Sequence, residues 1–175
     1  FLAVSLIHGE AASEVNAWGA GFRLLADGQH PHYGQVRVPV SLNGVTQVAA
    51  GGYFSLALNE DGEVWQWGLS GNRERDPQQI LAIAAGRYHA LALRSDRRVV
   101  AWGNNFAGQT NIPSGLSNVI AVAAGYSHSL ALTSEGRLIT WGSDLFGLGR
   151  IPEGCSNVVA ISARGHVSMA LTADG

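Results

Sequence analysis

The stretch "VIAVAAGYSHSLALTSEGRLITWG", residues 119–142, decides the fold because the chain contains its pattern several times. Residues 80–103, "ILAIAAGRYHALALRSDRRVVAWG", and residues 45–68, "VTQVAAGGYFSLALNEDGEVWQWG", are two further copies. Residues 158–175, "VVAISARGHVSMALTADG", begin a fourth. Recurrence at intervals of about 20 to 50 residues is typical of proteins built from stacked structural repeats.

Two landmarks recur in phase in these copies. A small-residue corner lies at Gly51, Gly86 and Gly125, at intervals of 35 and 39 residues, and Arg164 takes this place in the fourth copy. Trp-Gly pairs recur at intervals of 49, 35 and 39 residues, beginning at Trp18, Trp67, Trp102 and Trp141. The long first interval indicates an insertion within residues 19–34.

Each copy has the residue pattern of β-strands. Short apolar or alternating segments are separated by turn residues, and no window of 11 or more residues shows a helical stripe. Gly62 and Gly136 supply the positive φ that a tight hairpin needs, whereas Arg97 stands at this place in the second copy. The Trp of each Trp-Gly pair can fill the wedge between neighbouring sheets. We therefore expect an all-β protein of small sheets arranged radially.

The segment "AAGxxHSLAL" followed by "DGxVxxWG" resembles the regulator-of-chromosome-condensation type repeat, whose members fold as β-propellers. The resemblance covers the chain from Trp18 onward and implies four-stranded blades of about 39 residues, with four repeat units present. "GQTNIP", residues 108–113, makes secreted bacterial members such as the β-lactamase inhibitory propeller proteins the most similar. Since family propellers usually have about seven blades, a whole four-bladed ring and a fragment of a larger propeller both stay open.

The two ends of the chain leave further alternatives. Residues 1–13, "FLAVSLIHGEAAS", have the apolar run and small residues of a truncated leader, but they also suit the strand of a preceding blade. Residues 14–175 are the propeller repeats, and residues 14–19, "EVNAWG", could supply the strand that would follow the fourth copy. Open blade edges would otherwise favour self-association.

The recurring histidines are interpreted as structural. His89 and His128 occupy the same place in two copies, where Phe54 and Val167 stand in the other two. A residue that recurs at one place in each unit is more simply a strut, its ring nitrogens bonding neighbouring backbone, than a catalytic base. We therefore expect no catalytic residue, and the protein is predicted not to be an enzyme.

No cofactor or metal is expected either. Asp27, His30 and His32 have the residue types of a zinc site, but they lie in a loop that contains Gly and Pro. Cys155, the only cysteine, takes the place of Leu116 in the preceding copy and is predicted to be a small buried hydrophobe.

Composition narrows the choice of partner. The chain has 175 residues, 46% of them hydrophobic, with a net charge of -2 and a pI near 6.3. This leaves no basic stripe for nucleic acid, and no apolar run is as long as a membrane span. We expect another protein as partner, and a secreted or cell-surface location, with a cytoplasmic one as the alternative.

The resemblance points to the residues that would bind this partner. In the similar inhibitory propellers, the two or three residues after each corner carry aromatic contacts to a partner protein. By position these are, in this chain, Tyr53, Arg87, Tyr88, Tyr126, Ser127 and His166. Tyr and Arg dominate interface energies, although these tyrosines could instead pack on the neighbouring blade. A purely architectural role in a larger protein, and nucleotide exchange on a small GTPase, remain as alternative functions.

Overall fold

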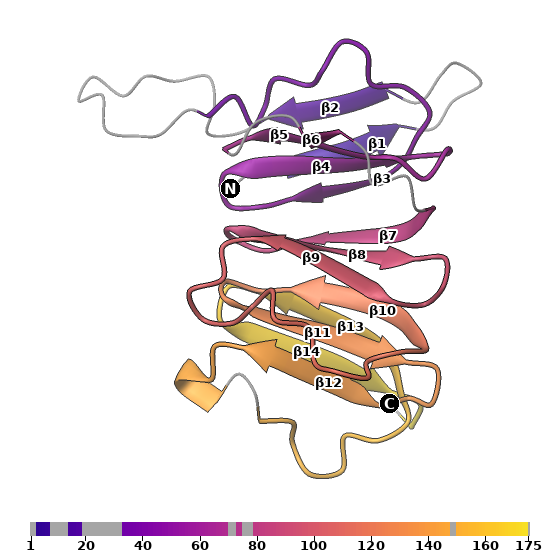
Figure 1. Cartoon of the computed structure of the whole chain (residues 1–175), viewed down its shortest axis with the longest axis vertical. Helices are drawn as coiled ribbons and strands as arrows, with labels where there is room; N and C mark the ends of the chain where they lie inside the picture. The colour runs from indigo at the N-terminus through magenta and orange to yellow at the C-terminus, as the bar shows by residue number, and fades with distance from the viewer. Residues whose placement is uncertain are drawn as a thin grey trace. The chain divides into compact units, whose positions relative to one another are not determined.

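The structure is a computed structural model that describes residues 3–7, 14–18, 33–69, 73–74, 79–147 and 150–174 (Figure 1). These residues form fourteen β-strands and one short 3-10 turn, Leu145–Gly147. The chain divides into two compact units, Phe1–Gln79 and Ile80–Gly175, and each is described by itself. The all-β prediction is confirmed.

The second unit consists of three antiparallel sheets in chain order. The first two have three strands each, β7-β8-β9 and β10-β11-β12, and the third has β13-β14. Their bounds are β7 Ile80–Ala85, β8 His89–Arg94, β9 Val99–Gly103, β10 Val119–Ala124, β11 His128–Thr133, β12 Leu138–Gly142, β13 Val158–Arg164 and β14 Val167–Thr172.

The first unit contains the remaining copy and the N-terminal strands. One sheet has the order β3-β4-β5-β6, with β3 Val45–Ala50, β4 Phe54–Asn59, β5 Val64–Gly68 and β6 Arg73–Glu74. The other pairs β1 (Ala3–Ile7) with β2 (Glu14–Trp18). That residues 1–13 include a leader stays a prediction.

The sheets are blades of a β-propeller, and the four predicted repeat units are all present as sheets of two to four described strands. The first two strands of each copy share one irregularity. In each copy the pairing skips the second residue of the first strand. The skipped residue lies between Val45 and Gln47, Ile80 and Ala82, Val119 and Ala121, or Val158 and Ala160. A shared bulge means that equivalent residues face equivalent neighbours from blade to blade.

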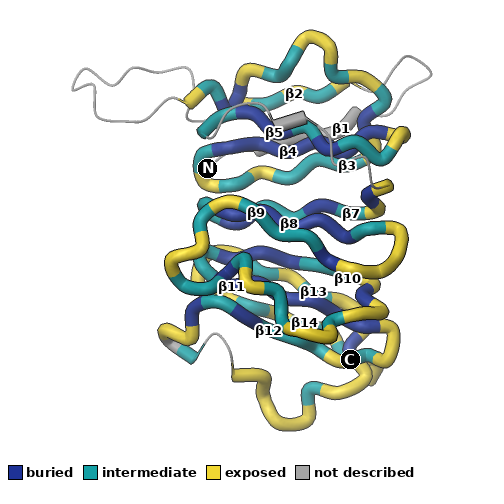
Figure 2. Tube along the Cα trace, in the orientation of Figure 1, coloured by how far each residue is buried: buried dark blue, intermediate teal, exposed yellow. Residues whose placement is uncertain are grey.

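The middle strand of each complete blade forms the core (Figure 2). All six residues of β4 and of β11 are buried, and Leu91, Leu130 and Leu132 have 1% or less of their surface exposed. A strand that is apolar on both faces is expected where sheets cover it on both sides.

The hairpin turns follow the prediction, including its exception. Gly62 and Gly136 have φ of 78° and 72°, and Arg97 adopts φ of 64° in the equivalent turn. The left-handed region costs a residue with a side chain about 1 kcal/mol, which glycine avoids.

The corner glycines are required by the ring three residues later. A Cβ atom at Gly86 or Gly125 would collide with the imidazole of His89 or His128. In the fourth copy the corner is Arg164 and the ring is replaced by Val167. The two departures therefore belong together, because a corner side chain and the ring need the same space.

The histidines connect consecutive blades, and each contacts a serine hydroxyl, whereas the sequence predicted backbone groups as the partners. His89 Nε2 lies 3.0 Å from Ser129 Oγ, and His128 Nε2 lies 2.8 Å from Ser168 Oγ. Ser129 Oγ donates to the carbonyl of Gln109, so the His89 Nε2–H donates to Ser129. The side chains at this place are adjacent in consecutive blades, which the sequence of one copy does not reveal.

A carbonyl in the "GQ" segment is held by the following blade. Trp141 Nε1 and Ser129 Oγ both donate to the Gln109 carbonyl, over 2.9 and 2.8 Å. The same pair of bonds ties Trp67 and Ser55 to the carbonyl of Gln35 in the first unit. Trp67 and Trp141 are therefore buried in apolar clusters, as predicted, and each also anchors the segment that precedes its blade, whereas Trp18 is 52% exposed.

Candidate functional site

The corner loops carry the predicted binding residues and are held by the third strand of their own blade. After the last three Trp-Gly pairs, the N–H of the next residue donates to a corner-loop carbonyl: Leu69 to Tyr53, Asn104 to Tyr88 and Ser143 to Ser127, over 2.8 to 2.9 Å. The glycine of each of these three pairs has φ near 100° and lies against that loop's backbone. Glycine is needed here because a side chain would collide with the loop.

Consecutive corner loops of the second unit are also bonded to one another. The N–H of Arg87 donates to the carbonyl of Gly125 over 3.2 Å, and the N–H of Tyr126 donates to the carbonyl of Gly165 over 2.6 Å. Both bonds connect one blade to the next, so the backbone of the three loops forms a continuous, ordered surface.

Four predicted side chains meet on this surface, and we call Arg87, Tyr88, Tyr126 and His166 the aromatic strip. The guanidinium carbon of Arg87 lies 4.4 Å from the ring centroid of Tyr126 and 5.2 Å from that of Tyr88. The Tyr88 and Tyr126 rings meet edge to face at 6.3 Å. The imidazole of His166 stacks on Tyr126 at 4.7 Å, with 18° between the planes. Three blades thus contribute to one cluster.

The strip is packed and accessible at the same time. Arg87, Tyr88 and Tyr126 are half-buried, and His166 is exposed. The tyrosines therefore pack against residues of neighbouring blades and still keep accessible surface, and a role in binding a partner stays a prediction. Cation–π and stacking contacts restrict the rotamers, which lowers the entropy that these side chains would lose on binding.

Ser127 and Tyr53 lie outside the strip. Ser127 is half-buried, and its carbonyl accepts the bond from Ser143. Tyr53 belongs to the first unit, where its ring meets that of Tyr33 edge to face at 5.9 Å. Tyr33, 43% exposed, was not among the predicted residues. Its place directly before the "GQ" motif was the signal that could have found it.

The surroundings of His89 and His128 favour the neutral form of both rings. Burial, and next the charge of His128, lowers the pKa of His89 to about 4. Burial also lowers the pKa of His128, with His166 as the second cause. A buried imidazole that must stay neutral and is bonded to a serine of the next blade suits a structural role.

No metal site is seen among the described residues, which contain no group of three or more His, Cys, Asp or Glu side chains able to hold an ion. The predicted metal candidates Asp27, His30 and His32 lie outside those residues.

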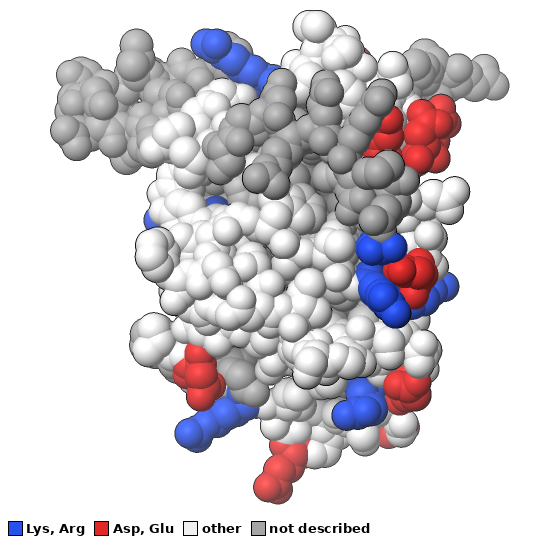
Figure 3. Space-filling model, in the orientation of Figure 1, with Lys and Arg blue, Asp and Glu red and all other residues white. Residues whose placement is uncertain are grey.

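None of the described segments contains a helix long and apolar enough to cross a membrane. Acidic and basic residues are intermixed on the face shown in Figure 3.

The family model for the Regulator of chromosome condensation (RCC1) repeat matches residues 45–74, 80–109 and 119–147. The chain belongs to this family. The three RCC1 matches begin at the first strand of the first three copies, so the repeat found in the sequence and the blade found in the structure are the same unit.

Solved propellers share the RCC1 fold with this chain at low sequence identity. The ectodomain of the receptor kinase CR4 from Physcomitrella patens is 20% identical with a TM-score of 0.75, and covers 99% of this chain and 46% of its own. Prp20p from Saccharomyces cerevisiae is 19% identical with a TM-score of 0.69, and the match covers 98% of this chain and 57% of the Prp20p chain. The chain therefore spans about half the length of these proteins. Among curated proteins, no sequence matches it significantly.

Proposed function

We propose that this RCC1-repeat chain is a non-catalytic protein-binding scaffold whose contact surface is the aromatic strip. The observation that supports the proposal is the convergence of Arg87, Tyr88, Tyr126 and His166, from three consecutive blades, on one partly exposed cluster. Loops on a rigid scaffold are the usual place of binding residues, and Tyr and Arg are enriched among the residues that dominate interface energies.

The partner is proposed to be a folded protein met outside the cell or at its surface. The resemblance to secreted inhibitory propellers supports this location, with the cytoplasm as the alternative. Among RCC1-type neighbours, the structure of Prp20p is described with its binding properties to Gsp1p and histones, and a further structure has Kap60 bound to yeast RCC1. These two neighbours support a protein as the class of partner.

The test compares capture of proteins by wild-type chain with capture by Tyr88→Ala and Tyr126→Ala variants. Each substitution should weaken a partner that uses the strip by about fivefold or more, equivalent to about 1 kcal/mol, with the fold unchanged by circular dichroism. Phe106→Ala is the matched control, because Phe106 is an aromatic residue of the same unit that is 98% exposed and lies outside the corner loops.

Candidate partners for direct measurement are a β-lactamase, which tests the inhibitory role, and a small GTPase, which tests nucleotide exchange. Binding of the β-lactamase that the strip variants lose would support the inhibitory role. Accelerated nucleotide release from the GTPase would support exchange instead. Equal capture by wild type, both strip variants and the control would overturn the proposal in favour of a purely architectural role.

A further inference from the structure

The hairpin that joins β8 to β9, residues 94–98, is strongly basic, and we call it the arginine turn. The eleven basic residues of the chain are all arginines, and three of them lie in this turn, "RSDRR", with Asp96 as its one acid. The corresponding turn of the next blade, residues 133–137, has one glutamate and one arginine. In Figure 3, basic side chains gather round an acidic one where this hairpin lies in Figure 1. The arginine turn therefore carries two more positive than negative charges.

Two features of the arginine turn oppose the stability of the fold. Arg97 adopts φ of 64°, in the left-handed region, where Gly62 and Gly136 stand in the two equivalent turns. Arg94 and Arg98 close the turn through a bond of 2.9 Å from the N–H of Arg94 to the carbonyl of Arg98, so two like charges flank it. Like charges at paired positions of a hairpin repel each other. Local strain that a simpler residue would avoid is concentrated at functional sites.

The same closing positions are complementary in the other two turns. In the first unit Asn59 Nδ2 donates to Glu63 Oε2 over 3.2 Å, and the N–H of Glu63 donates to Asn59 Oδ1 over 2.8 Å. In the blade after the arginine turn, the N–H of Arg137 donates to Thr133 Oγ1 over 3.3 Å. A pair of cations is therefore not needed to close this kind of hairpin.

Asp96 neutralises Arg94 and leaves two guanidinium groups available. Its Oδ2 lies 3.0 Å from Nη2 of Arg94, and its Oδ1 accepts a bond of 3.1 Å from the N–H of Arg98. Within the part of the chain that the structure describes, the side chains of Arg97 and Arg98 make no ion pair or hydrogen bond. Both residues are exposed, and the hairpin is coloured accordingly in Figure 2. Two neighbouring cations are thus open to solvent.

We propose that the arginine turn binds a doubly negative group on an acidic polypeptide segment, either a phosphorylated side chain or two adjacent carboxylates. A guanidinium presents its donors in a fork that matches the oxygens of a carboxylate or a phosphate. A phosphorylated side chain carries a charge of about -2, which balances the two available arginines. The bound anion also relieves the repulsion within the turn.

This site is separate from the aromatic strip and goes beyond the proposed function. Strand β8 begins at His89, directly after the corner loop that carries Arg87 and Tyr88, and ends at Arg94. The strip and the arginine turn therefore lie at opposite ends of one strand. A protein that contacts the strip does not have to reach the turn, so the two sites can be tested independently.

Nucleic acid suits the arginine turn less well than a polypeptide does. Binding of nucleic acid depends on many phosphate contacts, whereas one hairpin can make only a few. The chain has a net charge of -2, and the next hairpin presents Glu135, whose Oε1 accepts a bond of 3.3 Å from Asn118 Nδ2. An extended polyanion would meet this carboxylate beside the turn.

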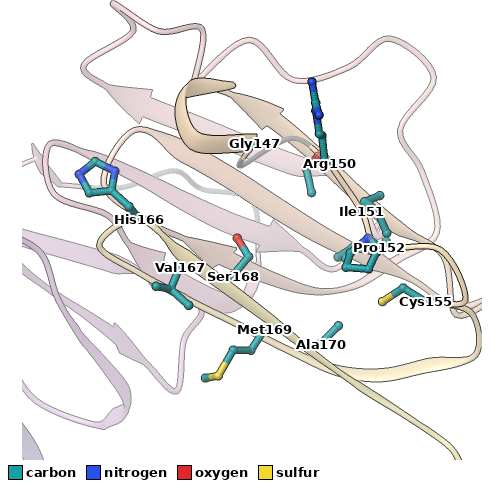
Figure 4. A pocket seen from close by; sticks show the side chains of 12 residues that line it. Gly147, Arg150, Ile151, Pro152, Cys155, His166, Val167, Ser168, Met169 and Ala170 are labelled. Carbon is teal, nitrogen blue, oxygen red and sulfur yellow. The ribbon is translucent and has the colours of Figure 1, made fainter.

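The pocket of about 350 Å³ between β12, β14 and residues 150–155 does not offer the same chemistry. Arg150 and His166 are the basic residues of its lining, and Figure 4 shows them well apart. The lining also includes Cys155, which is half-buried and not fully buried as predicted. A pair of neighbouring cations is thus a property of the arginine turn and not of this pocket.

The test measures binding of short fluorescent peptides to the full chain by fluorescence anisotropy. All peptides consist of glycine and serine: one has a central phosphoserine, a second has two adjacent glutamates, and a third has neither. We expect the two charged peptides to bind and the third not to bind, and salt at about 0.5 M should weaken binding about tenfold by screening. The charged peptide that binds more tightly identifies the source of the negative charge.

Arg97→Gly is the decisive variant, because it removes one charge and also relieves the left-handed strain. It should weaken binding of the charged peptides about fivefold or more, since charge-assisted bonds are lost, while the protein stays at least as stable as wild type. Arg98→Gln should weaken binding similarly. Arg137→Gln is the matched control, because it removes an exposed arginine from the place of Arg98 in the next turn. Tyr88→Ala, in the aromatic strip, should bind the peptides as wild type does.

Four outcomes would overturn the proposal. Unchanged binding by Arg97→Gly and Arg98→Gln would show that the turn is not the site. An equal loss in Arg137→Gln would show a general attraction to the charged surface. Loss of peptide binding in Tyr88→Ala would place the site on the strip. Tighter binding of a short DNA duplex than of either charged peptide would make nucleic acid the ligand.

Discussion

Strands β11 and β14 have nearly the same sequence, "HSLALT" and "VSMALT", and very different surroundings. Leu130 and Leu132 of β11 are 0% and 1% exposed, while Met169 and Leu171 at the same places of β14 are 63% and 54% exposed. The first pair is covered by the next blade, and the second pair has no such cover among the described residues. The comparison teaches that the repeat encodes a strand with an apolar face, whereas burial of that face depends on the neighbour.

The largest expected effect is on the free energy of unfolding, and it compares equivalent side chains of β11 and β14. Leu130→Ala should lower the free energy of unfolding by about 3 kcal/mol, because it removes a fully buried side chain from a packed core. Met169→Ala, at the same place of β14, should lower it by less than about 0.5 kcal/mol. Urea denaturation of both variants measures the difference. Similar losses would mean that the β14 face is covered in solution.

A second prediction concerns pH and distinguishes blades joined by histidine from those without it. The pKa of His89 is lowered from 6.5 to about 4 in the folded protein, so the unfolded chain binds more protons between these values. Stability contributed by the neutral ring is therefore fully present above about pH 6.5 and is lost as the pH falls toward 4, by up to about 3 kcal/mol.

Thermal melting between pH 7.5 and 4 measures this loss. The variant His89→Gln removes the group whose pKa changes and should show a flatter profile than wild type. Since the pKa of His128 is also lowered, part of the dependence should remain in that variant. A wild-type profile that is flat over this range would contradict the proposed cause.

A third prediction tests whether the corner glycine and the histidine ring three residues later are energetically coupled. Gly125→Ala should destabilise the protein by about 2 kcal/mol, because the new Cβ needs the space of the His128 imidazole and displaces its contact with Ser168. Adding His128→Val places a side chain at the corner and valine at the ring position, as Arg164 and Val167 do in the fourth copy. A double-mutant cycle measures the coupling. If the two losses simply add, corner and ring are independent.

The smallest expected effect concerns the hairpin turns. Arg97→Gly should stabilise the protein by about 0.5 kcal/mol, since relief of the left-handed strain slightly exceeds the entropy lost by fixing a glycine. Gly136→Arg, the reverse change in the equivalent turn, should destabilise it by about 1 kcal/mol or more. Denaturation midpoints of the two variants should therefore shift in opposite directions.

Part of the candidate site was also predictable from sequence. The alignment placed Arg87, Tyr88, Tyr126 and His166 after equivalent corners, and the structure brings these four together. The alignment did not predict that Arg87 lies over the ring of Tyr126 in the next blade. Distances between residues of different copies depend on how the sheets stack, which one-dimensional spacing does not contain.

The sequence by itself determined the repeat, the strands, the turns and the corner glycines, since all four follow from local sterics and from which face of a strand is apolar. Only the tertiary structure decided which atoms meet between blades. It showed that His89 and His128 contact serines, that the carbonyl of Gln109 accepts a bond from Trp141, and that Cys155, predicted to be buried, is only partly buried. The physical reason is that local preferences act within one chain segment, whereas packing is a property of two surfaces brought together.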